Sequence, residues 1–182
     1  YGGWQDQTIS QMGGLIQMNI SKDEKLQIKK KSVNNEIDKK IKNNFLLVYT
    51  KKKRISSKVV LSQKKRKSKI LDYYDNIKSL NKKLLFSMRS NNPKYIADIF
   101  NKHWENKKKL SSKMTSNVID NLYFRLMKNY NFLGGKLIGA GGGGFFLMVT
   151  PDKKKTISLL NRDKIAFIDF RIEKFGAKII EG

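Results

Sequence analysis

The 182-residue sequence predicts an α+β fold. Three stretches with helical spacing of apolar residues follow one another in the middle of the chain, and separated short apolar strands lie before and after them. This arrangement favours α+β over a doubly wound parallel sheet. With 39% hydrophobic residues the chain can bury a real core, which argues against wholesale disorder.

The first third of the chain predicts a short helix followed by a pair of strands. The helix is expected over residues 6–12, where Gly13-Gly14 ends it. Residues 15–20 alternate in part like a strand, and Leu26–Ile28 with Val33 are expected to form its partner. The polar stretch 34–44 is expected to be a seam, and the apolar run 45–49 a buried strand.

The middle and the end of the chain predict three further helices, then strands around a glycine run. The helices are expected over residues 68–90, from Pro93 to about 110, and from a Thr115 or Ser116 cap to Tyr130. Strands are expected at 136–138, 145–149 and 166–172, with a helix from Pro151-Asp152 to about Leu160.

The charge is strongly basic, with 39 Lys plus Arg against 15 Asp plus Glu and a formal net charge of +24. Such a balance raises nucleic acid as a partner. Only six of the basic residues are Arg, however, and Lys accompanies many Asn and Ile residues, as in an AT-rich genome. Residues 22–67 carry 17 basic and four acidic side chains, and no aromatic residues interleave the clusters 51–54 and 64–67. We expect solvated surface there, and nucleic acid is an unlikely partner.

The absence of Cys and the single His exclude disulfides, thiolate metal sites and His clusters, so no metal ligands are assigned to the chain. That His, His103, is expected to be packed and hydrogen-bonded, and Trp104 to lie in the core. No stretch approaches the ~18–20 apolar residues of a membrane span. A cytoplasmic protein without a membrane partner is therefore expected, and its oligomeric state is open.

Five glycines occur among the six residues 139–144, between two apolar segments. Glycine permits positive φ values and close backbone approach, so consecutive N–H groups of such a loop can converge on an anion. A plain tight turn is the alternative. The pattern is not a Walker loop, and no βαβ unit with a Gly-x-Gly-x-x-Gly start is present.

With its flanks, the glycine run resembles the third sequence motif of the GHMP kinases, the superfamily of galactokinase and of homoserine, mevalonate and phosphomevalonate kinases. The matching residues are Gly134-Gly135-Lys136-Leu137-Ile138 followed by 139–146. The opening Gly3-Trp4-Gln5-Asp6-Gln7-Thr8, followed by Gly13-Gly14, is similar to the sugar-kinase segment that carries an active-site Asp. Residues 103–111 and 45–57 resemble the heptose kinase and fucokinase branch, although the Thr-Gly expected there is Thr50-Lys51.

The resemblance covers nearly the whole chain and is strongest to D-glycero-D-manno-heptose phosphate kinases. It implies the end of a GHMP N-terminal lobe over residues 1–34. A ferredoxin-like C-terminal lobe, with helices packed on an antiparallel sheet, is implied over residues 35–182. The implied activity is ATP-dependent phosphorylation of a sugar or sugar phosphate, with heptose phosphate favoured, and the implied cofactors are ATP and Mg²⁺.

The same resemblance implies the site residues. Asp6 is the expected catalytic residue, which accepts the proton of the acceptor hydroxyl. Gly3, Gln5 and Gln7 are expected to bind the substrate. The loop is expected to support the nucleotide phosphates through Gly139, Ala140, Gly141, Gly142, Gly143 and Gly144.

One motif of the family has no counterpart in the chain. The phosphate loop of the pattern Pro-x-x-x-Gly-Leu-Gly-Ser-Ser-Ala is absent, together with the acidic Mg²⁺ ligand. We therefore expect the C-terminal part of a kinase, with the missing N-terminal half as a partner and an inactive isolated chain. The alternatives are a catalytically inactive sugar-binding, nucleotide-binding or regulatory module and, less favoured, a Lys-rich nucleic-acid-binding protein.

Overall fold

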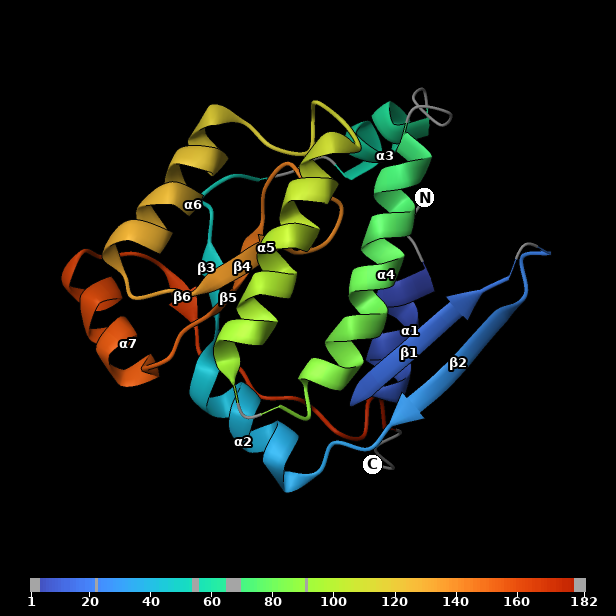
Figure 1. The fold of residues 1–182 in the computed structure, drawn as a ribbon, viewed down its shortest axis with the longest axis horizontal. Helices are drawn as coiled ribbons and strands as arrows, with labels where there is room; N and C mark the ends of the chain where they lie inside the picture. The colour runs from blue at the N-terminus through green and yellow to red at the C-terminus, as the bar shows by residue number, and fades with distance from the viewer. Residues whose placement is uncertain (1–3, 22, 54–55, 65–69, 91, 179–182) are drawn as a thin grey trace. The chain divides into compact units, whose positions relative to one another are not determined.

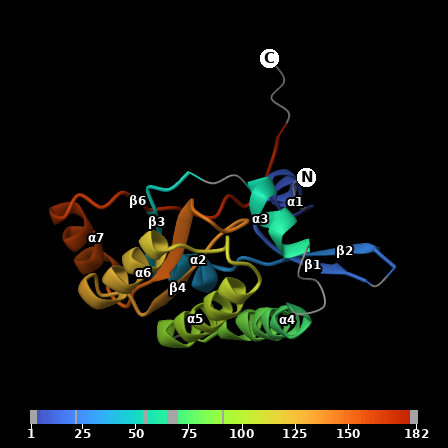
Figure 2. The same cartoon turned by 90° about the horizontal axis from the view of Figure 1, so that it is seen from above.

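The computed structural model describes residues 4–21, 23–53, 56–64, 70–90 and 92–178, and the chain divides into two compact units (Figures 1 and 2). The first unit combines Tyr1–Ile41 with Arg171–Gly182, and the second is Lys42–Phe170. Helices and antiparallel strands make up both, so the predicted α+β class is confirmed. No helix in the described part of the chain is long and apolar enough to cross a bilayer.

The first unit contains a short helix and a two-stranded hairpin. Helix α1 (Trp4–Met12) ends at Gly13 and Gly14, whose φ angles are 60° and 74°. Strands β1 (Leu15–Ile20) and β2 (Leu26–Lys31) pair antiparallel. The predicted helix and strand pair are thus present, but Val33 lies beyond β2.

The prediction of a seam at residues 34–44 is wrong, because they form helix α2 (Asn35–Asn44). Asn34 Oδ1 accepts a hydrogen bond from Ile37 N at 2.9 Å, which satisfies one of the free N–H groups at the start of the helix. Ile37 and Ile41 are four residues apart and share a face, and Ile41 is buried. Two apolar residues make too weak a stripe to stand out in so polar a segment.

The second unit is built on a four-stranded antiparallel sheet. Its strands β3 (Phe45–Tyr49), β4 (Gly134–Leu137), β5 (Phe145–Val149) and β6 (Phe167–Ile168) stand in the order β4-β5-β3-β6. The register pairs Leu46 with Met148 and Val48 with Phe146. Directly paired residues lie on one face of a sheet, and these four side chains are all fully buried.

Among the described residues, five helices lie wholly in the second unit: α3 (Ser56–Lys64), α4 (Leu71–Ser87), α5 (Pro93–Lys109), α6 (Asn117–Asn129) and α7 (Lys153–Arg162). Helix α5 contacts β4 and β5, and α4 lies beside α5 (Figure 2). Asn92 Oδ1 accepts from Lys94 N and Asp152 Oδ1 from Lys155 N, each at 3.0 Å, so both caps stabilise the starts of their helices. Ser116 precedes α6 without a side-chain cap bond.

One helix and the bounds of two strands in the second unit differ from the prediction. Helix α3 was not expected, because its basic and serine-rich sequence shows no clear apolar stripe. Strand β4 begins at Gly134, two residues earlier than predicted. Strand β6 has two residues, Phe167 and Ile168, instead of the seven expected over 166–172, because its ladder with β3 is short and the chain from Arg171 belongs to the first unit.

The core of the second unit is aromatic at its centre. Trp104 of α5 is fully buried, which confirms its predicted place in the core. Its ring meets Phe146 of β5 edge to face, with ring centroids 5.8 Å apart, and Tyr123 of α6 lies 5.2 Å from the same ring. Edge-to-face pairs of this kind stabilise a core beyond their buried area.

Side chains from two helices bind the backbone of edge strand β4. The N–H of Gly135 donates to Asn101 Oδ1 at 3.0 Å, and its carbonyl accepts from the Tyr123 hydroxyl at 3.1 Å. The Leu137 carbonyl accepts from Lys107 Nζ at 3.0 Å. Burial raises the pKa of Tyr123 to about 12, so its hydroxyl remains a donor at any physiological pH. The strand that enters the glycine loop is therefore held by hydrogen bonds from α5 and α6.

Candidate active site

The predicted catalytic carboxylate lies on the first turn of α1. Asp6 is the third residue of this helix and its side chain is exposed, as are those of Gln5 and Gln7. Successive helical residues are turned by about 100°, so the two glutamines lie on either side of Asp6. A carboxylate in the first turn is stabilised by the helix dipole. The other predicted substrate residue, Gly3, lies outside the described residues.

The other end of α1 is fixed by the C-terminal segment of the chain. Gly14 N donates to Glu173 O at 2.6 Å, and Ala177 N donates to Ser10 O at 3.0 Å. Lys30 Nζ of β2 donates both to Met12 O at 2.6 Å and to a carbonyl of that segment. These bonds hold the helix that carries Asp6 at its C-terminal end.

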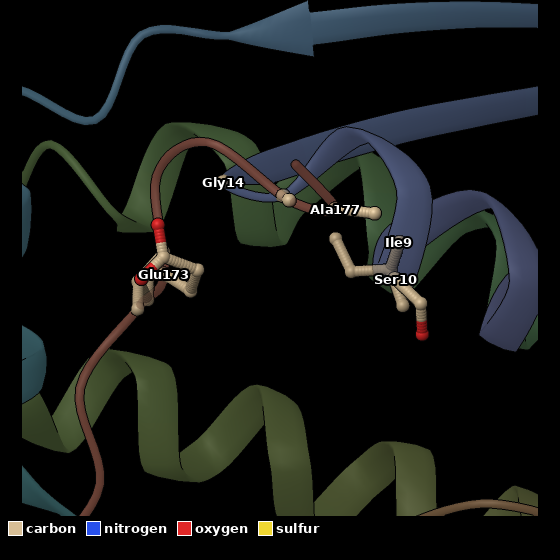
Figure 3. Close-up of a pocket in the computed structure, with 8 residues that line it drawn as sticks. Ile9, Ser10, Gly14, Glu173 and Ala177 are labelled. Carbon is tan, nitrogen blue, oxygen red and sulfur yellow. The ribbon is translucent and has the colours of Figure 1, made fainter. Parts of the chain in front are cut away.

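A pocket of about 550 Å³ lies within the first unit, between α1 and the C-terminal segment (Figure 3). Ile9 and Ser10 of α1 lie on one side of it and Glu173 on the other. Gly13 and Gly176 cross so closely that a Cβ on either would overlap backbone atoms of the other. Asp6, Gln5 and Gln7 do not line this pocket, so it does not coincide with the predicted acceptor site.

The glycine loop joins β4 to β5 and uses conformations that favour glycine. All five of its glycines have positive φ: 73° at Gly139 and between 73° and 150° over Gly141–Gly144. A Cβ at Gly141 would overlap Met114 Sδ, and one at Gly143 would stand 2.5 Å from Lys52 O. The backbone conformation therefore favours glycine at each of these positions, and close packing also favours it at Gly141 and Gly143. A plain tight turn that accepts other residues would not have five glycines in such conformations.

Two amides of the loop are already bound inside the fold. Gly142 N donates to Met114 O at 2.8 Å, and Gly144 N donates to Lys52 O at 3.0 Å. The expected convergence of loop amides on an anion therefore does not extend to these two groups. Lys107 Nζ of α5 donates to the Gly139 carbonyl at 2.6 Å.

The segment that follows β3 completes the support of the loop. Both the N–H and the hydroxyl of buried Thr50 donate to the Gly144 carbonyl, at 2.9 and 2.8 Å. The next residue, Lys51, has a φ of 54°, a left-handed conformation that favours glycine. The resemblance to the heptose kinase branch predicts glycine at this position, and the chain has Lys51 there in a conformation that favours glycine. Arg54, also part of this resemblance, lies outside the described residues.

The single histidine is packed but not fully hydrogen-bonded. Burial, together with the positive charges of Lys136 and Lys107, lowers the pKa of His103 to about 3. The imidazole is therefore neutral at physiological pH. Its Nδ1 atom is buried and has no hydrogen-bond partner in the described part of the chain. The predicted packing is confirmed, but the expected hydrogen bonding is wrong for this atom.

Sequence reasoning missed several residues that shape the site. Asn101 and Met114 hold β4 and the loop through contacts between elements far apart in the sequence, and no local pattern predicts such contacts. Tyr123 belongs to the apolar stripe of α6, so its spacing predicted burial but not the role of its hydroxyl. Asp6 with its glutamines belongs to the first unit and the glycine loop to the second, and the structure describes these two parts of the predicted site separately.

Comparison with known proteins supports the predicted resemblance. No family model matches the chain. A curated D-glycero-alpha-D-manno-heptose 7-phosphate kinase from Campylobacter jejuni is 34% identical over 85 residues, which are 46% of this chain and 25% of the relative. The crystal structure of a D-glycero-D-manno-heptose 1-phosphate kinase from Bacteroides thetaiotaomicron covers all of this chain at 18% identity, with a TM-score of 0.68.

A further solved structure extends the likeness beyond sugar kinases. The phosphomevalonate kinase of Streptococcus pneumoniae, in complex with phosphomevalonate and AMPPNP, matches 78% of this chain at 19% identity with a TM-score of 0.55. These structural likenesses show the α+β fold, and together with the sequence identity to a heptose phosphate kinase they confirm the resemblance to the GHMP kinases. Within that class, the sequence likeness is to a heptose phosphate kinase. The chain spans 50% and 40% of the two solved structures.

Proposed function

We propose that this chain is the C-terminal part of an ATP-dependent GHMP-type kinase that phosphorylates a sugar or sugar phosphate, with a heptose phosphate as the favoured acceptor. The observation that carries the proposal is the glycine loop. It stands where the GHMP motif is expected, and all five of its glycines have positive φ. The identity to a heptose 7-phosphate kinase supports the choice of acceptor. The proposed division remains an end of the first lobe over residues 1–34 and a second lobe over 35–182.

In the proposed reaction Asp6 accepts the proton of the acceptor hydroxyl, whose oxygen attacks the γ-phosphorus of ATP while the bond to the β-phosphate oxygen breaks. Positioning and charge neutralisation supply most of the catalysis in phosphoryl transfer. Exposed Asp6 is free of hydrogen bonds that would compete for its carboxylate in the described part of the chain. Gly3, Gln5 and Gln7 are proposed to bind the substrate hydroxyls.

The glycine loop is proposed to support the nucleotide phosphates through its shape. Since Gly142 N and Gly144 N are bound within the protein, the part of the loop suited to face a phosphate is Gly139–Gly141. In the family Mg²⁺ neutralises the developing charge. No group of three or more metal-ligating side chains lies together in the described residues, which by themselves do not fit a complete Mg²⁺ site. Its ligands and the phosphate loop are proposed to come from the partner half.

The test is transfer of radiolabelled phosphate from ATP to a D-glycero-D-manno-heptose phosphate. The chain alone is expected to show negligible transfer, because the groups that neutralise the γ-phosphate are absent. The chain joined to the half of the Bacteroides thetaiotaomicron kinase that it does not match is expected to gain activity. Turnover of ~1–100 s⁻¹ by the chain alone would contradict the half-enzyme proposal. Sugar binding without transfer by the joined protein would favour the inactive binding module.

A further inference from the structure

The last turn of α5 is joined to the entrance of the glycine loop by one side chain. Lys107 Nζ donates to Leu137 O at 3.0 Å and to Gly139 O at 2.6 Å. Leu137 is the last residue of β4, and Gly139 is the first glycine of the loop. The ammonium group therefore bridges the carbonyls on either side of Ile138, and hydrogen bonds from a charged donor are stronger than those between neutral groups.

The neighbours of Lys107 on the helix fix the face on which it lies. Trp104, three residues earlier, is fully buried, and residues three or four apart share a helix face. Burial, together with the charges of Lys136 and Lys107, lowers the pKa of His103 to about 3. Because this imidazole is neutral, it does not repel the ammonium group that follows it by one turn.

The residues that Lys107 holds form a tight turn whose central residues are Gly139 and Ala140. The φ of Gly139 is 73°, whereas Ala140 has no positive φ. A turn with positive φ at both central residues and one with positive φ at the first alone differ in the direction of the peptide unit between them. The hydrogen bond from Lys107 to Gly139 O is available in only one of these directions, so it favours the observed turn.

This direction decides where the next amide points. The Gly139 carbonyl and the Ala140 N–H belong to one planar peptide unit and point in opposite directions. Because the carbonyl points to Lys107, the Ala140 N–H points away from it, and this N–H has no hydrogen-bond partner in the described part of the chain. Gly142 N and Gly144 N, by contrast, are bound inside the fold.

We propose that Lys107 is a positioning residue that aims the Ala140 N–H at a phosphate oxygen of the nucleotide. This inference rests on the proposed function. Backbone N–H groups of turns can bind anions, whereas a rotated peptide unit would present the Gly139 carbonyl, which repels them. The neighbouring Lys108 pairs with Glu105 at 2.8 Å and has no part in this role.

Three substitutions isolate the role of the ammonium group. Lys107→Met keeps an unbranched side chain but removes the charge and the donors. Lys107→Arg keeps the charge and enough donors for both carbonyls, so it should restore the function. Lys108→Met is the matched control, because it removes the same charge from the next residue of the helix.

The first measurement follows the amide NMR signals of the isotope-labelled full chain during titration with inorganic tripolyphosphate, which has the phosphate chain of ATP without the nucleoside. Salt at about 0.15 M screens the exposed lysines. The Ala140 signal is expected to shift, and Lys107→Met should weaken the binding seen at this signal about tenfold or more. Lys107→Arg and Lys108→Met should leave it nearly unchanged.

The second measurement uses the joined kinase, in which the unmatched half of the Bacteroides thetaiotaomicron kinase is linked to the full chain. Lys107→Met should raise the KM for ATP about tenfold or more, with little change in the KM for the heptose phosphate. A purely structural role would lower the fraction of folded enzyme, and so the apparent kcat, without raising the KM for ATP.

Three results would overturn the proposal: an Ala140 signal that does not respond to tripolyphosphate, equal weakening by Lys107→Met and Lys108→Met, or an active joined kinase whose KM for ATP resists Lys107→Met. Phosphate transfer is scored separately from the amide signal. A shift that depends on Lys107, without any transfer, supports the positioning role and refutes the kinase. Transfer with an unchanged KM for ATP in the Lys107→Met variant does the reverse.

Discussion

Valine at position 141 would test how strictly the glycine loop depends on its backbone. The φ of Gly141 is 103°, where an L side chain costs about 1–3 kcal/mol. Its Cβ would also overlap the sulfur of Met114, which is fully buried, and overpacking of this kind costs about 1–3 kcal/mol. The expected loss is the sum of the two effects, about 2–6 kcal/mol. A domain has only about 5–15 kcal/mol of stability in total.

The assay is urea unfolding followed by tryptophan fluorescence. The chain has two tryptophans, the exposed Trp4 in the first unit and the buried Trp104 in the second, so a Trp4→Phe background makes the signal report the second unit alone. With a urea slope of about 2 kcal/mol per molar, the middle of the range for small domains, the midpoint should fall by about 1–3 M. Ala140→Val is the control, because Ala140 is in the same loop without a positive φ.

A double-mutant cycle separates the two causes. Met114→Ala removes the sulfur that a Cβ at position 141 would overlap, so Gly141→Val should cost about 0.5–3 kcal/mol less in that background. The backbone part of the cost remains in both backgrounds. Equal urea midpoints for Gly141→Val, Ala140→Val and the parent would show that the loop is a tolerant turn and would refute this reasoning.

Three further predictions have defined outcomes, and two of them include a control substitution. Asp6→Asn in the joined kinase should lower kcat by about 10²–10⁴-fold with little change in substrate binding, and steady-state kinetics that leave kcat unaltered would remove Asp6 from the catalytic role. Lys51→Gly should raise the free energy of unfolding of the second unit in urea by about 0.5–1 kcal/mol, because glycine relieves the left-handed φ at this position. Lys52→Gly should lower the free energy of unfolding by a similar amount. A Lys51→Gly variant less stable than the Lys52→Gly variant would show that Lys51 is not strained. Tyr123→Phe should cost about 1–3 kcal/mol and exposed Tyr95→Phe almost nothing. Because burial raises the pKa of Tyr123 to about 12, its extra contribution is fully present below pH 10 and is lost as pH rises towards 12, which unfolding measured across this range would detect.

The sequence predicted the elements that carry a local signal, such as a helix cap or a continuous apolar run. Pro93 after Asn92 and the Asp152 cap set the starts of α5 and α7, and the apolar run 45–49 became β3. The polar helix α2 was missed, although the Asn34 side chain before it and the spacing of Ile37 and Ile41 are usable signals. Local composition dominated the prediction there, whereas the structure shows a helix with Asn34 bonded at its start and Ile41 buried.

The site was predictable to a smaller extent. A run of five glycines predicts unusual backbone, and the structure gives each a positive φ. Whether their amides face a ligand or the protein depends on contacts with Met114 and Lys52, which lie about 30 and 90 residues away. Periodicity and spacing carry no information on such partners. The role of Asp6 and its neighbouring glutamines remains a prediction.

Neither edge strand of the sheet in the second unit is open to the addition of another strand. At one edge, side chains of α5 and α6 occupy the hydrogen-bonding groups of Gly135 in β4, and at the other, β6 is only two residues long. Short or covered edges deny an incoming chain a template for strand addition. Aggregation of the stored protein should therefore start from the hairpin of the first unit and spare this sheet. A storage buffer or formulation that improves shelf life would have to act on the hairpin.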